Sequence, residues 1–431
     1  MDFNRLYQSR IVTAEEAVRI IKSGDRVFLT GNCSVPQTLL AALVEYAPEL
    51  HDVEIDQALS VGPADYVSPE MENHLRVNTM FVSNNVRKAV HEGRADFTPV
   101  LLSEFTLLFR RGHLPLDIAL VHVSPPDNYG FCSFGLEVGL TKTPAESAKI
   151  IIAEVNQQMP RTLGDSFIHV SKLDYIVPVD YPLTEMPMDS EGPSEIIEKI
   201  ASYIAELIPD GASMQMGIGA IPDAVLKYLY EKKDLGVHSE LFSDGVIDLV
   251  EAGVITNARK SLHPGKIIAG FILGTQRLYK WVDDNPLIEL HPTEYVNDPF
   301  VIAQNNRMVA INSAIEVDLT GQVCADSIGP KIYSGVGGQF DFIYGASRSL
   351  DGVPIIALPS TARGNGRIVP MLKPGAGVVT SRNHVRYVVT EYGIADLYGR
   401  TIHQRAKALI NIAHPEFRDS LTREASELSY I

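Results

Sequence analysis

The chain has 431 residues, a formal net charge of −16 at pH 7 and an isoelectric point near 5.2. This acidic balance argues against nucleic acid or an anionic membrane as the main partner, because both select basic surfaces. It leaves room for an anionic small molecule, which a local patch can bind. Hydrophobic and charged fractions of 45% and 21% are typical of a globular protein, and the length favours two domains.

The N-terminal segment lacks the apolar stretch of a secretory signal, and the longest apolar runs are too short to span a membrane. We therefore expect a cytoplasmic protein without membrane contact. The chain has three widely spaced cysteines and no CxxC pair, which argues against a disulfide framework and a zinc site: Cys33, Cys132 and Cys324. No histidine pair has metal-ligand spacing with nearby acids, so we expect no metal.

Short β-rich runs alternate with helical patterns along the chain, which predicts an α/β fold. The first clear unit is a strand at 25–31, followed by a helix whose apolar face carries Leu39, Leu40 and Leu43. Residues 182–193 contain three prolines among polar residues and are typical of a linker. Beyond them a helix is predicted from an apolar face at 3.6-residue spacing, formed by Ile196, Ile197, Ile200, Ile204 and Leu207. A strand at 212–217 and a helix through Val225, Tyr228 and Leu229 follow.

The two halves repeat one plan. Gly31-x-x-x-x-Pro36 matches Gly217-x-x-x-x-Pro222, and the same spacing sets Glu54 opposite Glu240. The correspondence continues in order, with segments 124–130 and 315–321 (Asp127 with Asp318), 149–155 and 353–359, and 173–177 and 385–389. We predict two similar open α/β domains, residues 1–185 and 186–431, with the active site in the cleft between them. Glu54 is given no role.

Glu240 lies near the end of the strand-like segment 236–242, directly before the turn Ser243-Asp244-Gly245. Carboxylates are rarely buried unless they are paired, so such a residue indicates either a salt bridge or chemistry. For an arbitrary glutamate the salt bridge is the commoner outcome. His238, two residues earlier, is more simply explained as a structural residue at the strand end.

Two glycine-rich turns are candidate binding loops. Gly217 and Gly219 remove side chains before a helix start, where amide donors and the helix dipole favour an anion. A tight strand-to-helix connection explains this first turn equally well. Gly335, Gly337 and Gly338 form a denser turn, whose backbone N–H groups are suited to an oxyanion hole. The chain contains no GxGxxG and no GxxxxGK[ST] sequence.

Five segments together resemble the acetyl-CoA hydrolase/transferase family: "MGIGAIPDAV", "HSELFSDGVIDLVEAGVITN", "SGVGGQFDF", "PIIALPSTA" and "VVTEYGIADLYGRTIHQRAKALINIAHPEFR". The resemblance spans essentially the whole chain. It implies that Glu240, in the "HSE" motif, is a nucleophile. It also implies coenzyme A contacts at these positions: Gly217, Ile218, Gly219, Ala220, Ile221, Ile315, Gly337 and Gly338.

The resemblance further implies a ping-pong CoA-transferase acting on short-chain acids such as butyrate, 4-hydroxybutyrate and acetate, through a glutamyl-CoA thioester. Coenzyme A is then a substrate, no tightly bound cofactor is needed, and the protein is expected to be a homo-oligomer. An acyl-CoA hydrolase is the alternative enzyme, and a non-catalytic sensor of CoA esters is the alternative of another class. Two basic clusters, Arg259-Lys260 and Arg363 with Arg367, are expected to be solvated surface in preference to phosphate ligands.

Overall fold

The computed structural model describes residues 3–186 and 194–431. The chain folds as two units, one formed by Met1–Met186 and Ile268–Val296 and the other by Pro187–Ile267 and Asn297–Ile431. The domain division at 185/186 stays a prediction. The structural units differ from it because the first segment ends at Met186, one residue later, and because residues 268–296 also belong to the first unit. The predicted linker 182–193 lies mostly outside the described residues.

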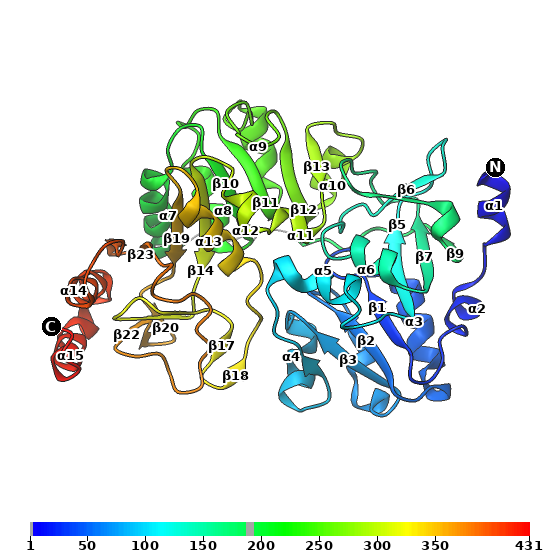
Figure 1. Ribbon diagram of the computed structural model, residues 1–431, viewed down its shortest axis with the longest axis horizontal. Coiled ribbons are helices and arrows are strands. Elements are labelled where there is room, and N and C mark those ends of the chain that lie inside the picture. The colour runs from blue at the N-terminus through cyan, green and yellow to red at the C-terminus, as the bar shows by residue number, and fades with distance from the viewer. Residues whose placement is uncertain (1–2, 187–193) are drawn as a thin grey trace. The chain divides into compact units, whose positions relative to one another are not determined.

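The first unit is built on a seven-stranded parallel sheet with the order β4-β3-β2-β1-β5-β7-β9, drawn in blue to cyan in Figure 1. Its strands are β1 Arg26–Leu29, β2 Val53–Gln57, β3 Leu75–Thr79, β4 Asp96–Phe97, β5 Ile118–Val123, β7 Ile150–Asn156 and β9 Tyr175–Val179. The strands β6 Phe131–Ser133 and β8 Phe167–His169 pair with each other outside this sheet. The helices are α1 Phe3–Ser9, α2 Ala14–Val18, α3 Gln37–Tyr46, α4 Asn84–His91, α5 Leu102–Arg110 and α6 Lys142–Ser147. The later segment adds β12 Ile267–Ile272, α10 Gln276–Val282, β13 Ile288–Leu290 and α11 Thr293–Val296.

The second unit contains strands in the order β11-β10-β14-β19-β23-β24, all parallel to their neighbours except the antiparallel edge strand β24. These strands are β10 Ser213–Met216, β11 Gly236–Phe242, β14 Met308–Ser313, β19 Val353–Ala357, β23 Tyr387–Thr390 and β24 Gly393–Asp396. Short strands follow β14 and β19: β15 Glu316–Asp318, β16 Val323–Cys324, β17 Ser327–Ile328, β18 Lys331–Ile332, β20 Thr361–Ala362, β21 Asn365–Gly366 and β22 Ile368–Val369. The helices are α7 Glu195–Leu207, α8 Ala220–Lys227, α9 Gly245–Glu251, α12 Pro299–Ile302, α13 Gln339–Arg348, α14 Ile402–Ile412 and α15 Pro415–Glu427.

The predicted α/β class and internal repeat are confirmed. The order β2-β1-β5-β7-β9 in the first unit is matched by β11-β10-β14-β19-β23 in the second. The loops also agree in detail, because the Asp127 carboxylate accepts the N–H groups of residues 129 and 131, and the Asp318 carboxylate those of residues 320 and 322. Each loop then closes on a glycine with positive φ, Gly130 or Gly321.

The predicted pairing of Glu54 with Glu240 is wrong. Glu54 lies near the start of β2 and forms an ion pair with Arg26 at 3.1 Å, whereas Glu240 lies near the C-terminal end of β11. The two halves differ in the lengths of their helices and loops, so equal spacing from the two glycines does not give equivalent positions.

The predicted helix at 196–207 is confirmed as α7, with Ile200 and Ile204 fully buried. Ile196, expected on the same face, is 41% exposed because it lies in the first helical turn. Helix α8 ends at Lys227, one residue before the predicted Tyr228. Within the described part of the chain, no helix is both long and apolar enough to cross a membrane.

Candidate active site

Glu240 is positioned by an irregularity in β11. The register between β10 and β11 runs from Met214 opposite Val237 to Met216 opposite Leu241, so three residues of β11 face a single residue of β10. Such a bulge bends a strand and redirects its side chains, and bulges are frequent beside active sites. His238, Ser239 and Glu240 are the three residues that form it.

The Glu240 carboxylate contacts two groups of the second unit. Asn297 donates a hydrogen bond from Nδ2 to Oε2 of Glu240 at 3.0 Å, and the backbone of Gly338 provides a second hydrogen bond. Burial raises the pKa of Glu240 to about 7, while the bonds from Asn297 and Gly338 act in the opposite direction. The arrangement holds a carboxylate that changes charge near neutral pH, as expected of a catalytic group.

Gly338 lies against this carboxylate because it has no side chain. A Cβ at this position would be 2.0 Å from Oε2 of Glu240 and 2.5 Å from Nδ2 of Asn297. Gly338 immediately precedes α13, and Gly337 before it has φ of 55°, which favours glycine. The second glycine turn therefore lies directly against Glu240, and this close contact explains why the turn has glycine at position 338.

The first glycine turn lies at the end of the neighbouring strand. β10 ends at Met216, and Gly217 to Gly219 lead into α8, with Gly219 at φ of 117° before the helix start. Ile218 is 37% exposed, whereas Ile221 is buried. The hydroxyl of Ser239 connects the turn to the bulge, because it accepts from the N–H of Met216 at 3.2 Å and donates to the Met216 carbonyl at 3.1 Å.

Ile315 lies beyond β14 and is fixed through its main chain. Its N–H donates to the Cys324 carbonyl at 2.8 Å, and its carbonyl accepts from Nε of Arg367 at 2.8 Å. The same guanidinium also bonds the Ala314 carbonyl. The expectation that Arg367 is solvated surface is therefore wrong, because its guanidinium is committed to holding this backbone segment.

Lys260 also differs from the expected solvated surface. It is buried, and its Nζ donates to the carbonyls of Val237 and Lys266, both at 2.7 Å. This lysine supports the strand that carries Glu240. His238 is fully buried with its ring 6.3 Å from that of Phe342, measured between centroids, which agrees with the structural role expected of it.

In the first half, the start of α3 corresponds to the first glycine turn, and a side chain of the protein itself binds there. Glu154, buried in β7, accepts the N–H of Leu39 in the first turn of α3 at 2.5 Å and also the hydroxyl of Tyr181. The Tyr181 oxygen in turn accepts the N–H of Gln37 at 3.1 Å. Burial raises the pKa of Glu154 to about 7. An internal carboxylate therefore satisfies the helix start that an anionic ligand would use.

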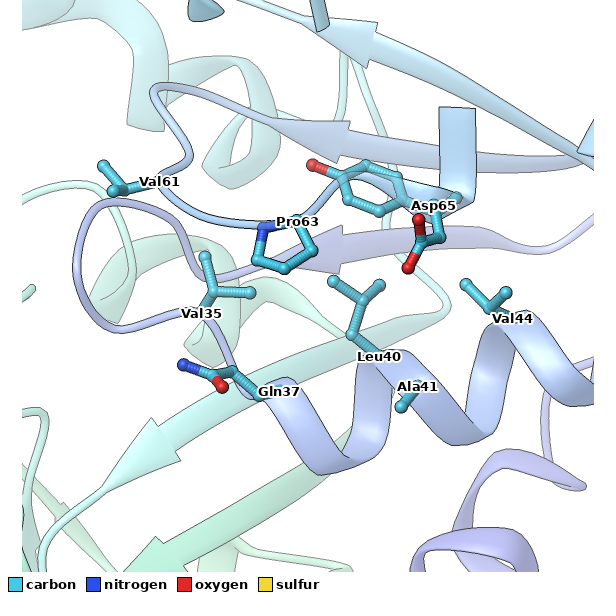
Figure 2. Close-up of a pocket in the computed structure, with 9 residues that line it drawn as sticks. Val35, Gln37, Leu40, Ala41, Val44, Val61, Pro63 and Asp65 are labelled. Atoms are coloured by element: carbon cyan, nitrogen blue, oxygen red, sulfur yellow. The ribbon is translucent and has the colours of Figure 1, made fainter. Parts of the chain in front are cut away.

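A cavity of about 350 Å³ lies beside α3 in the first unit (Figure 2). Most of its wall is apolar, and three of its lining residues are polar: Gln37, Asp65 and Tyr66. None of the residues predicted for the site lines this cavity. The cavity is therefore not assigned to the proposed chemistry of Glu240.

Asn297 and Ser239 are the residues that sequence reasoning missed. Asn297 is fully buried and stands between α11 and α12, with no motif around it that indicates contact with Glu240. Ser239 is part of the "HSE" segment, so its proximity to the glutamate was visible, although its bond to Met216 was not.

Comparisons with known proteins give consistent results over the whole chain. Family models described as the N-terminal and C-terminal domains of acetyl-CoA hydrolase/transferase match residues 1–184 and 274–425. A 4-hydroxybutyrate coenzyme A transferase of Clostridium kluyveri is 52% identical over 427 residues, which cover 98% of this chain and 99% of that protein. A succinyl-CoA:acetate/propanoyl-CoA:succinate CoA transferase of Fasciola hepatica is 50% identical and covers 95% of this chain and 86% of its own. The solved 4-hydroxybutyrate CoA-transferase of Porphyromonas gingivalis is 40% identical with a TM-score of 0.86, covering 99% of this chain and 100% of that one.

Proposed function

Because the chain belongs to the acetyl-CoA hydrolase/transferase family, we propose that it is a CoA-transferase that exchanges coenzyme A between a short-chain acyl-CoA and a carboxylic acid. The observation that carries this proposal is the Glu240 carboxylate, held by Asn297 and the backbone of Gly338 with its pKa raised by burial. Glu240 is the nucleophile of the proposed reaction.

The first step is attack of a Glu240 carboxylate oxygen on the thioester carbonyl. The carbon–sulfur bond breaks, coenzyme A leaves as a thiolate, and an acyl-glutamyl anhydride remains. The thiolate then attacks the glutamyl carbonyl of that anhydride, which releases the acyl group as a free carboxylate and leaves a glutamyl-CoA thioester. Covalent catalysis of this kind divides a difficult exchange into steps of similar free energy.

An acceptor carboxylate completes the cycle by attacking the glutamyl-CoA carbonyl. The mixed anhydride forms again, now with the new acyl group, and the returning thiolate cleaves it at the acyl carbonyl. The products are a new acyl-CoA and the regenerated Glu240 carboxylate. Charge is conserved throughout, because each step exchanges one anion for another, and neither a redox reaction nor a metal ion is required.

Asn297 and Gly338 are proposed to serve two purposes in this cycle. Before attack, their hydrogen bonds orient the Glu240 carboxylate. During attack on the glutamyl carbonyl, negative charge develops on its oxygen, and donors already aimed there stabilise it without reorganisation. Such donors contribute about 3–4 kcal/mol each to lowering a barrier.

The two turns and the Ile315 segment are proposed to bind coenzyme A. Gly217, Ile218, Gly219, Ala220 and Ile221 present the start of α8, whose amides and dipole favour an anionic group. Gly337 and Gly338 form the turn beside Glu240, and Ile315 offers a backbone fixed by Arg367. Coenzyme A acts here as a substrate, and the proposal includes no tightly bound cofactor.

The acyl substrates that we propose are 4-hydroxybutyryl-CoA or butyryl-CoA, with acetate as acceptor. Two relatives named above as 4-hydroxybutyrate CoA-transferases support this class of acid, at 52% and 40% identity. A cytoplasmic, homo-oligomeric enzyme of short-chain acid metabolism is part of the same proposal. Acyl-CoA hydrolysis is the competing activity, in which water in place of an acid attacks the anhydride or the glutamyl-CoA.

The test is to incubate the protein with 4-hydroxybutyryl-CoA or butyryl-CoA, with and without acetate, and to measure acetyl-CoA and free coenzyme A. If the protein is a transferase, acetyl-CoA should form only when acetate is present, and double-reciprocal plots should give parallel lines. Release of free coenzyme A at the same rate without acetate would instead establish hydrolysis. A protein that binds the esters and turns over neither would be a sensor.

Mass spectrometry of the peptide that contains Glu240 locates the covalent intermediate. Acyl-CoA without an acceptor should produce a coenzyme A adduct on Glu240 that borohydride reduces. Glu240→Gln should lose the adduct and several orders of magnitude of activity, whereas Glu231→Gln, a change at an exposed glutamate, should keep both. A near-normal rate for Glu240→Gln would refute the assignment.

A further inference from the structure

We propose that Ser239 is a positioning residue that fixes Glu240 relative to the turn that starts at Gly217. The inference rests on the proposed function, because it concerns how the nucleophile is presented to coenzyme A. It extends that function to a residue whose hydroxyl bonds the main chain of Met216.

Ser239 supplies hydrogen bonds to main-chain groups of β10 at the bulge in β11. Between the paired positions Met214–Val237 and Met216–Leu241, β11 has two residues more than β10. A regular parallel ladder cannot continue across this mismatch, and the main-chain groups of β10 at the bulge require other partners. The Ser239 hydroxyl bonds both the N–H and the carbonyl of Met216, at 3.2 and 3.1 Å.

These two bonds join the residues next to the proposed chemistry. Ser239 directly precedes Glu240, and Met216 directly precedes Gly217. The hydroxyl and both Met216 groups are buried, so water does not replace the bonds when the hydroxyl is lost. One side chain thus connects the nucleophile strand to the coenzyme A turn.

Loss of the hydroxyl should allow the bulge to relax. A shift in the pairing of a strand changes the face to which its side chains point. Relaxation would move the Glu240 carboxylate relative to Asn297 and Gly338, which contact it from other parts of the second unit. A misplacement of about 1 Å at a reacting group reduces rates by as much as 100-fold.

The experiment compares Ser239→Ala with Ser213→Ala. Ser213 lies in β10 and is fully buried, and its hydroxyl has no hydrogen-bond partner among the described residues, so its loss removes the same atom without breaking a bond. We expect Ser239→Ala to lower kcat/KM for the acyl-CoA by about 10- to 100-fold, and Ser213→Ala to stay within about twofold of wild type. Circular dichroism and thermal unfolding establish that each variant is folded.

A pH profile separates positioning from a general loss of stability. The donors on Glu240 hold its pKa down against burial, so weakening them should move the midpoint of the rate profile to higher pH in Ser239→Ala only. If Ser239→Ala does not fold, Ser239→Cys replaces it, and the thiol, a weaker donor of similar shape, should give a smaller change in the same direction. A rate within twofold of Ser213→Ala with an unchanged midpoint would overturn the inference.

The covalent adduct distinguishes failure of this inference from failure of the proposed function. Wild-type protein that forms no adduct on Glu240 contradicts the proposed function. Wild type and Ser239→Ala that form the adduct at equal rates contradict only the role of Ser239. Slow adduct formation in Ser239→Ala, with normal formation in Ser213→Ala, supports both.

Discussion

Asn297 donates from Nδ2 to Oε2 of Glu240 at 3.0 Å across a separation of 57 residues in the chain. Because the Asn297 side chain is fully buried, the carboxylate meets a donor held in one orientation. The bond favours the ionised form of Glu240, while burial opposes it. The balance between these two effects leads to predictions about rate and stability.

The transferase rate should depend on the ionisation of Glu240. Its pKa is raised to about 7, so the reactive carboxylate form is the minor one below that pH. Formation of the glutamyl-CoA adduct in single-turnover experiments should therefore fall about tenfold for each pH unit below 6. A rate that stays constant from pH 8 to pH 5 would contradict this assignment of the pKa.

The same shift predicts a cost in stability at high pH. Unfolded Glu240 ionises near 4.5, so between pH 4.5 and 7 the native state holds a proton that the unfolded state has lost, and stability falls as pH rises through this window. Glu240→Gln should raise the free energy of unfolding at pH 8 by roughly 3 kcal/mol at most. Most of that gain should disappear at pH 5 in urea titrations. Equal gains at both pH values, or the same gain in Glu231→Gln, would show that ionisation is not the cause.

Removal of the Asn297 donor should raise the pKa of Glu240 further. Asn297→Ala leaves the partly buried carboxylate with fewer hydrogen bonds, so the midpoint of the rate profile should move to higher pH and kcat should fall about 100-fold. Asn305→Ala is the matched control, because Asn305 is also fully buried and its side chain has no hydrogen-bond partner in the described part of the chain. A loss of activity without movement of the midpoint would argue that Asn297 acts only through packing.

The two glycine turns should respond differently to an added methyl group. In Gly338→Ala the new Cβ would lie 2.0 Å from the Glu240 carboxylate, so adduct formation should be nearly abolished. In Gly217→Ala the nearest atom is Pro222 Cγ at 4.0 Å, so the protein should fold normally and its KM for acyl-CoA should rise while kcat changes less. Steady-state kinetics of both variants, with melting temperatures, test this. An unchanged KM in Gly217→Ala would remove that turn from the proposed binding surface.

Much of the fold could be predicted from the sequence because it depends on local patterns. Strand-to-helix alternation and the repeated order of segments led to two similar parallel sheets, and even the Asp127 and Asp318 loops were paired correctly. The dense glycine turn correctly predicted a close approach of another group to the backbone. That group is the Glu240 carboxylate, which lies where a Cβ at Gly338 would be.

The remaining features depend on contacts between distant residues. The bulge that turns Glu240 is a difference in register between two strands, which neither strand shows alone. Asn297 reaches the site only through the fold of the second unit, and no local pattern marks it. Arg367 and Lys260 were predicted to be solvated because charged residues usually are. Backbone carbonyls that satisfy their charge belong to segments up to 53 residues away, which composition does not reveal.

Glu154 gives the duplication its asymmetry. By accepting the Leu39 amide and the Tyr181 hydroxyl, it fills in the first half the place that an incoming anion would need. The first half is thereby satisfied by its own residues, so we expect only the second half to supply a nucleophile. Complete trapping with acyl-CoA should accordingly saturate at one equivalent per polypeptide, however many chains assemble.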